Sequence, residues 1–216
     1  MITYLARVFV APDGRHGNPV AVVLGDLPDR PERQRIAARS PAPATVFVAP
    51  DGRSVRIHNR KLERPFAGHP LLGTAAVLRH LGTPADTLET PAGTVPLWHD
   101  HGTEWLQAPS RWSPPVTHRR LTTPADVEAL TEAPPDEPVQ VWAWIDETSG
   151  TVRARQFAPS EGKPEDEACG SATMVLATLL GRPLTVHHGR GSLIHAHPHG
   201  TAVNLGGLCT ITRPRP

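Results

Sequence analysis

The chain has 216 residues and a formal net charge of +1, with 38% hydrophobic and 5% aromatic residues. Charges of both signs are interspersed without a basic stripe, which argues against a nucleic-acid partner. No apolar stretch approaches the roughly 18 residues that a membrane span needs, and the first residues do not resemble a signal peptide. Cys169 and Cys209 form neither a metal pair nor a disulfide framework, so we expect a cytoplasmic protein.

The octapeptide VFVAPDGR occurs at 8–15 and again at 46–53. Pro restricts φ and Gly permits φ > 0, so each copy predicts a strand that enters a tight turn. We expect surface helices near 30–39 and 125–131. Short β-prone runs predict further strands at Val20–Leu24, Val55–His58, Val139–Ile145, Val152–Phe157 and Ala202–Leu205.

Two similar apolar segments, 66–82 and 168–181, each begin with a small residue or cysteine before a glycine and each close on a glycine. A segment that is apolar all round predicts a buried helix, and Gly82 and Gly181 suit the C-terminal cap. The starting glycines, Gly68 and Gly170, lie 102 positions apart, about half the chain. The pattern indicates two copies of one unit.

The expected fold is α+β, with two pseudo-symmetric lobes that each wrap a curled, mostly antiparallel sheet around a central helix. Prolines concentrate at 109–138, which we interpret as turns and short extended pieces that connect the lobes. The N-terminal lobe is then 1–108. The C-terminal lobe is 109–216, shortened, with terminal strands able to cross back to the first lobe.

The start of each buried helix is a candidate binding site for an anion, because the first turn exposes unpaired N–H groups and a partial positive charge. Gly68 and Gly170 let a ligand approach the backbone, and His69 and Ser171 follow them. If a pseudo-twofold relates the halves, both starts face one cleft and form a carboxylate clamp.

Cys169 stands at a helix start, where a lowered thiol pKa would suit a base or a nucleophile; the alternative is a buried small apolar residue. Asp166 is either a capping carboxylate or a general acid/base. We expect Glu165 and Glu167 to be solvated.

His195, His197 and His199 would share one face of a strand and could hold Zn²⁺ or Cu²⁺. Pro198 interrupts that ladder, so an exposed edge or hairpin is favoured and no metal is predicted. The glycines at 14–25 and 52 form no phosphate-binding loop, so no cofactor is expected.

Four blocks in order resemble the PhzF-like family of phenazine biosynthesis, within the diaminopimelate epimerase and proline racemase superfamily. The opening block leads into Gly-Asn-Pro, the second is similar to Glu-Leu-Pro-Phe-Ala-Gly-His-Pro, and the third to Arg-x-Phe-x-Pro followed by Glu-Asp-Pro-x-Thr-Gly-Ser-Ala. These three blocks stand at 9–24, 63–78 and 152–172. The fourth block, which matches the closing strands of the family, stands at 189–196 and 203–207.

The resemblance implies a site between two lobes that moves protons in small carboxylic acids without a cofactor. By position, His69, Asp166 and Ser171 match site residues of the family, and Gly68 and Gly170 match its anion-binding glycines. Family members often carry a catalytic Glu where this chain has Ala44, so the usual base is absent. Cys169 replaces the common Thr, but Ala67 stands where racemases have a second thiol.

These features predict an isomerase that acts on a small carboxylic or amino-acid-derived metabolite, with Cys169 or Asp166 as its base and His69 as a stabiliser of negative charge. A one-base dehydratase and an inactive, small-molecule-binding homologue are the alternatives. The chain is short for the family, with strands missing between about 110 and 150. A partner subunit in a homodimer could cover the opening.

Overall fold

A computed structural model describes residues 1–135, 138–161 and 163–212. The α+β prediction is confirmed: the described residues form a mixed sheet with few helices. The helices are α1 (Arg30–Arg39), α2 (Gly68–His80), α3 (Pro124–Glu128) and α4 (Gly170–Leu180), with 3₁₀ turns η1 (Ser110–Trp112) and η2 (Pro159–Glu161). Within the described ranges, no helix combines the length and apolar character that crossing a bilayer requires.

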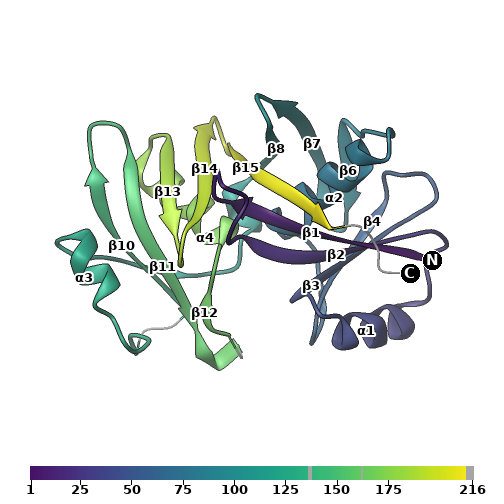
Figure 1. Cartoon of the computed structure of the whole chain (residues 1–216), viewed down its shortest axis with the longest axis horizontal. Helices are drawn as coiled ribbons and strands as arrows, with labels where there is room; N and C mark the ends of the chain where they lie inside the picture. The colour runs from purple at the N-terminus through teal and green to yellow at the C-terminus, as the bar shows by residue number, and fades with distance from the viewer. Residues whose placement is uncertain (136–137, 162, 213–216) are drawn as a thin grey trace.

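The strands form two groups, on the right and left of Figure 1, and β15 runs from the centre toward the right-hand group. Those of the first half are β1 (Ile2–Val10), β2 (Asn18–Leu24), β3 (Ala44–Val48), β4 (Val55–Asn59), β5 (Glu63–Arg64), β6 (Thr87–Thr90), β7 (Gly93–Asp100) and β8 (Thr103–Ala108). Those of the second half are β9 (Thr117–Arg120), β10 (Val139–Asp146), β11 (Thr151–Ala158), β12 (Lys163–Asp166), β13 (Leu184–His188), β14 (Ser192–His199) and β15 (Ala202–Thr212).

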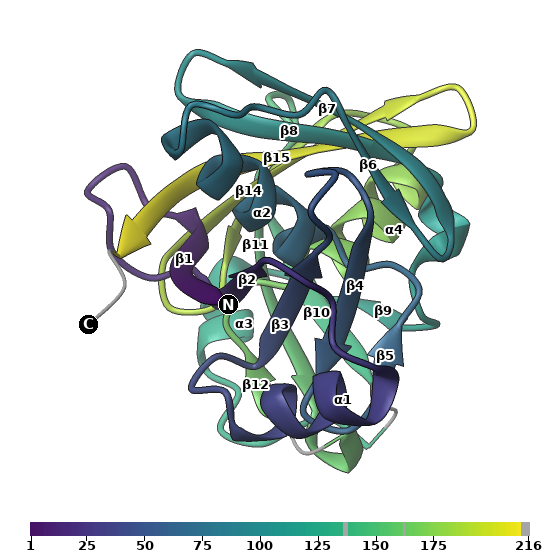
Figure 2. The same ribbon diagram turned by 90° about the vertical axis from the view of Figure 1, so that its right-hand side faces the viewer.

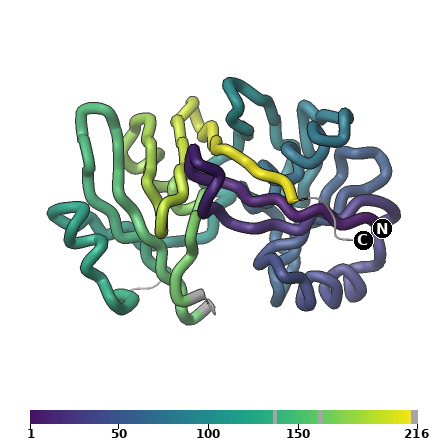
Figure 3. The backbone as a smooth tube through the Cα atoms, viewed as in Figure 1, coloured from purple at the N-terminus to yellow at the C-terminus, as the bar shows by residue number. Residues whose placement is uncertain are grey.

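One continuous path of strands joins the halves, in the order β5-β4-β3-β2-β1-β15-β14-β13-β11-β10-β9. Most pairs are antiparallel, and β2–β3, β11–β13 and β9–β10 are parallel. The last strand, β15, pairs with β14 and also with β1 and β8 of the first half. The yellow β15 therefore lies beside the purple β1 at the centre of the trace in Figure 3.

Both predicted central helices are present, and α2 packs on β1, β2, β8 and β15, as Figure 2 shows. All of 70–78 in α2 is buried, in keeping with its almost entirely apolar sequence, and the one hydroxyl, of Thr74, donates to the backbone oxygen of Pro70. The last turn of α4 differs from the prediction, because Leu179 is 65% exposed. Each helix is followed by a glycine with positive φ, Gly82 and Gly181, as expected.

The two VFVAPDGR copies form the predicted strand ends and turns. Gly14 and Gly52 have φ of 79° and 69°, values that glycine adopts without a steric cost. Ahead of the first turn, Phe9 also has a positive φ, 67°, at an irregularity in the β1–β15 pairing. A buried aromatic residue in this region is costly and persists only where its surroundings impose it.

The described residues of the proline-rich stretch 109–138 include turns and the short extended strand β9, in keeping with our interpretation, and they also add to the second lobe. Within it, β9 adds a parallel strand to β10, and α3 covers the apolar cluster of Val139, Val141 and Phe157. Trp142 and Trp144 share the opposite face of β10, with ring centroids 5.2 Å apart. The segment therefore completes the sheet of the second lobe.

Leu205, at the centre of β15, is the side chain against which both central helices begin. A Cβ added to Gly68 would lie 2.5 Å from Leu205 Cδ2, and one added to Gly170 would lie 3.0 Å from the same methyl carbon. Leu205 is fully buried, so any displacement of its methyl group would disturb the surrounding core. The two helix starts are thus held close together by one residue.

We predict that Leu205→Ala lowers the free energy of unfolding by about 2–5 kcal/mol, because it removes fully buried methyl groups and leaves a cavity. Urea unfolding followed by tryptophan fluorescence measures the change. Leu179→Ala, a matched truncation on the exposed turn of α4, should cost less than about 0.5 kcal/mol. Equal effects of the two substitutions would contradict this account of the core.

Candidate active site

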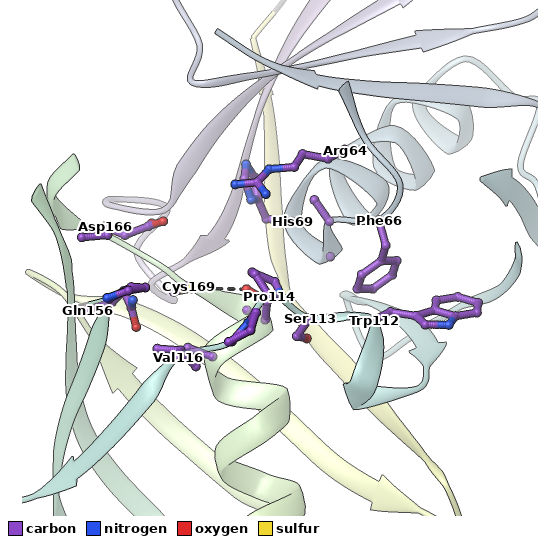
Figure 4. Close-up of a pocket in the computed structure, with 18 of the residues that line it drawn as sticks. Arg64, Phe66, His69, Trp112, Ser113, Pro114, Val116, Gln156, Asp166 and Cys169 are labelled. Atoms are coloured by element: carbon purple, nitrogen blue, oxygen red, sulfur yellow. Dashed lines mark hydrogen bonds between the residues drawn. The ribbon is translucent and has the colours of Figure 1, made fainter. Parts of the chain in front are cut away.

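A cavity of about 260 Å³ lies between the lobes, and the six residues predicted from the sequence line it together: Gly68, His69, Asp166, Cys169, Gly170 and Ser171. Figure 4 shows His69 reaching the cavity from the first lobe and Asp166 and Cys169 from the second. The two halves of the repeat therefore contribute to one site, as the pseudo-symmetry predicted.

The two helix starts at this cavity differ from those of the surface helices. Asp29 caps α1 and Thr123 caps α3, each accepting a hydrogen bond from a backbone N–H of the first turn. The corresponding residues of α2 and α4, Ala67 and Cys169, make no such side-chain bond within the described structure. The first turns of α2 and α4 also hold no acidic residue. The partial positive charge at each of these helix starts is therefore not offset by a side chain of its own N-cap or first turn.

The structure adds a packing reason for glycine at these starts. We predicted that Gly68 and Gly170 allow a ligand to approach the backbone. In the structure, a Cβ at either position would meet Leu205, and at Gly170 it would also meet the ring of Phe9 at 3.0 Å. The glycines are therefore required by packing beneath the helices, which leaves the cavity side of each first turn open to a ligand.

Asp166 is held by the first lobe. Asn18, from the Gly-Asn-Pro segment, donates from Nδ2 to Asp166 Oδ1 at 2.6 Å and to the backbone oxygen of Ala168 at 2.8 Å. The N–H of Ala168 donates to the same Asp166 oxygen. The alternative that Asp166 caps α4 is wrong, because the N-cap position of that helix is Cys169.

The expectation that Glu165 and Glu167 are solvated is also wrong. Glu165 accepts two hydrogen bonds of 2.8 Å from Arg155, which hold the pKa of that carboxyl below its ordinary value. Glu167 accepts hydrogen bonds from Ser192 Oγ and from the N–H of Arg190.

Ser192 in turn accepts a 2.9 Å hydrogen bond from the N–H of Gly17. Glu167 and Ser192 therefore tie the β1–β2 loop of the first lobe to the second lobe. This connection runs directly beside the bond between Asn18 and Asp166, so the lobes are joined at the rim of the site.

The Cys169 sulfur lies 3.4 Å from Ser171 Oγ, and the residue is partly exposed at the cavity. The other cysteine, Cys209, belongs to β15 and packs against the core. Burial raises the pKa of the Cys209 thiol well above its ordinary value, because desolvation disfavours the thiolate. Both cysteines are free thiols.

Ala44 lies at the start of β3 with 6% of its surface exposed, packed in the main core. The catalytic glutamate that the resemblance associates with this position is thus replaced by a core methyl group. Arg64 of β5, by contrast, lines the cavity, where the family pattern given above has leucine. Compared with that pattern, the first lobe offers one carboxylate fewer and one guanidinium more.

Several cavity residues were not identified from the sequence. Phe66 and Trp112 form one wall, with ring centroids 5.6 Å apart, and Gln156 of β11 lies beside Asp166. The strand pattern of 152–157 could have shown that Gln156 shares a face with buried residues. The contribution of η1 could not be anticipated, because its stretch was interpreted as a connection.

The histidines of β14 contribute to a different surface. His195 and His197 pack near the ring of Trp105, with centroids 6.0 and 5.0 Å from it, and His199 is exposed. Among the described residues, no group of three or more His, Cys, Asp or Glu side chains is arranged to hold a metal ion.

The fold is that of the proline racemase and epimerase-like class. The family model "Phenazine biosynthesis-like protein" matches residues 8–134, and the chain belongs to this family. An uncharacterised isomerase of Deinococcus radiodurans is 30% identical over 91% of this chain and 88% of its own. The trans-2,3-dihydro-3-hydroxyanthranilate isomerase of Pseudomonas fluorescens is 30% identical over 88% and 87%. These names support an isomerase.

Solved structures agree on the fold. A phenazine biosynthesis PhzC/PhzF protein from Clostridium difficile superposes with a TM-score of 0.80 at 20% identity, covering 100% of this chain and 98% of its own. A hydroxyproline epimerase from Agrobacterium vitis gives a TM-score of 0.57 at 14% identity, with 98% and 92% covered.

We predict that iodoacetamide alkylates Cys169 in the folded protein well before Cys209, because desolvation raises the pKa of the partly buried Cys209 thiol and so leaves little thiolate at neutral pH. Peptide mass spectrometry after timed quenching measures both rates. In urea the two rates should become similar. Faster labelling of Cys209 in the folded state would contradict the placement of the two thiols.

Proposed function

We propose that the protein is a cofactor-independent isomerase that transfers a proton between carbons of a small carboxylic or amino-acid-derived metabolite. The observation that supports this most directly is the meeting of two uncapped helix starts with Asp166, Cys169 and His69 in one cavity. A carboxylate of the substrate would bind the backbone N–H groups of both helix starts, where the partial positive charges favour an anion.

In the proposed reaction, a base removes a proton from a carbon next to the carboxyl or imine group, and the electron pair moves into an enolate-like system. Helix-start N–H groups and His69 would stabilise the negative charge that develops there. The protonated base then returns the proton to a different carbon, which shifts the double bond. No net oxidation occurs, and one base is sufficient because no stereocentre must be approached from both faces.

Asp166 is our candidate for the base, and Cys169 is the alternative. Asn18 and the N–H of Ala168 fix one Asp166 oxygen, which orients the carboxyl group at the cavity wall. A base acts only when it is held within hydrogen-bond reach of the proton that it abstracts. The contact of Cys169 with Ser171 places its sulfur at the start of α4, where it could bind substrate or serve as the base.

Ala44 favours a second candidate, a homologue that binds a small molecule without turning it over. A core methyl group cannot carry a proton, so this chain lacks the glutamate that the family pattern places there. A third candidate is a dehydratase, in which one base in the same cavity catalyses loss of water from the substrate.

Two similar proteins are named trans-2,3-dihydro-3-hydroxyanthranilate isomerases. Their substrate by name, trans-2,3-dihydro-3-hydroxyanthranilate, is the first compound to test. The same likeness supports our proposal of a role in natural-product biosynthesis. We also propose a cytoplasmic homodimer without nucleic-acid or membrane partners. The two free thiols suit a reducing compartment.

We predict that Asp166→Asn lowers kcat by about 10²–10⁴-fold, the range that a general acid/base contributes. Turnover is followed by ¹H NMR in D₂O, where transfer through an exchangeable base introduces deuterium at a substrate carbon. Asp100→Asn, on the exposed end of β7, is the control and should retain the wild-type rate.

Cys169→Ser separates the two candidate bases. If kcat falls in Cys169→Ser and not in Asp166→Asn, Cys169 is the base. Binding of the compound by the wild type without any deuterium exchange would favour the non-catalytic homologue.

A further inference from the structure

One side of the central strands faces away from the core. β7, β8, β15, β14 and β13 pair in that order. Figure 2 shows β7, β8 and β15 along the top of the molecule, with α2 beneath them. Buried and partly exposed residues alternate along β8 and β14, so every second side chain points outward. Both central helices lie on the inner side, where they begin against Leu205. The outward side of these five strands is called the outer face below.

Formal charge is almost absent from the strands of the outer face. They contain two formally charged residues: Glu104, which is buried on the inner side, and Asp100, at the end of β7. By contrast, five of the ten residues of α1 are charged. Charged residues are depleted and aromatic residues enriched at the centre of protein–protein interfaces. The outer face therefore has the composition of an interface and not that of a free surface.

Two tryptophans lie side by side on the outer face. Trp98 and Trp105 are paired across β7 and β8, with ring centroids 6.0 Å apart and ring planes within 4° of parallel. A Cβ added to Gly206 would lie 2.4 Å from Trp105 Cε3, so the Trp105 ring rests against the backbone of β15. Trp98 remains 38% exposed. Aromatic side chains held in this way lose little conformational freedom when a partner covers them.

Polar side chains of the outer face are paired with one another. Gln107 donates from Nε2 to Asn204 Oδ1 at 2.9 Å, and Thr185 Oγ1 lies 3.3 Å from His195 Nδ1. Burial lowers the pKa of His195 and of His197, so both imidazoles are neutral at pH 7. Covering a neutral polar group costs little free energy when its hydrogen bond is already made within the protein.

The outer face spans both lobes. β7 and β8 belong to the first lobe, β13 and β14 belong to the second, and β15 pairs with both β8 and β14. Its centre is therefore the strand that joins the two halves of the sheet. On that strand Asn204 and Gly206 point outward, while Leu205 points inward to the two helix starts.

We infer that the outer face is the interface of the homodimer, where it packs against the outer face of a second copy of this chain. A twofold axis places the same surface on both sides of such a contact. A face with almost no formal charge can oppose itself without like-charge repulsion. Nucleic acids and anionic membranes are bound by basic side chains, which these five strands do not contain. The inference rests on the homodimer proposed above and names its contact surface.

Size-exclusion chromatography with light scattering tests the interface at pH 7.5. The wild type should have twice the 23.3 kDa mass of one chain. Trp98→Glu should be a monomer with unchanged circular dichroism, because the dimer would bury a carboxylate from each copy without a counter-charge. Leu62→Glu is the matched control, since Leu62 is 45% exposed and lies outside the outer face. This variant should remain a dimer.

Trp98→Ala provides a second test that adds no charge. Its dimer Kd, measured by sedimentation over a dilution series, should rise by about tenfold or more, the loss that truncation of a central interface tryptophan causes. An unchanged Kd would contradict the placement of Trp98 in the contact.

A dimer that persists in Trp98→Glu would overturn the interface and leave the homodimer with a different contact. A monomeric wild type would overturn both, and quenching of its tryptophan fluorescence by an oligosaccharide would then assign the outer face to a sugar. A folded but monomeric Leu62→Glu variant would also contradict the outer face as the contact. None of these results bears on the isomerase, which Asp166→Asn tests separately.

Discussion

The contact of both central helices with Leu205 is the constraint on which the rest of the site depends. The starts of α2 and α4 come from segments about a hundred residues apart, yet a single methyl carbon lies beneath Gly68 and Gly170. Their first turns therefore converge, and neither is closed by a side-chain cap from its N-cap residue in the described structure. Two partial positive charges in one small cavity favour an anionic ligand in a way that one exposed helix start would not.

The reactive groups are fixed by hydrogen bonds that cross between the lobes. Asn18 orients Asp166, and one residue earlier the N–H of Gly17 reaches Ser192 and, through it, Glu167. The β1–β2 loop and the start of β2 therefore hold the two lobes at a fixed separation, and the same hydrogen bonds fix the position of the Asp166 carboxyl group. With Ala44 in the core, the carboxylate of Asp166, the thiol of Cys169 and the imidazole of His69 are the bases on the described walls of the cavity. This arrangement suits proton transfer on one face of a substrate better than inversion of a stereocentre.

Local patterns were sufficient to predict the parts of the structure that depend on neighbouring residues. The starts and ends of α2 and α4 follow from glycines that flank apolar runs, and the turns at Gly14 and Gly52 from Pro-Asp-Gly. Features that depend on register between distant strands could not be predicted in this way. Glu167 was expected in solvent because its partner Ser192 lies 25 residues further on. Gln156 was not identified as a cavity residue because its place beside Asp166 depends on the pairing of β11 with β12.

The central claim is that both helix starts bind one carboxylate, and an NMR titration tests it most directly. Benzoate is added to ¹⁵N-labelled protein while the backbone amide signals of Gly68 and Gly170 are followed. The account predicts that both signals shift with the same Kd, while the amide of Gly52, in a distant turn, does not. A shift confined to one helix start, or no shift at either, would contradict it.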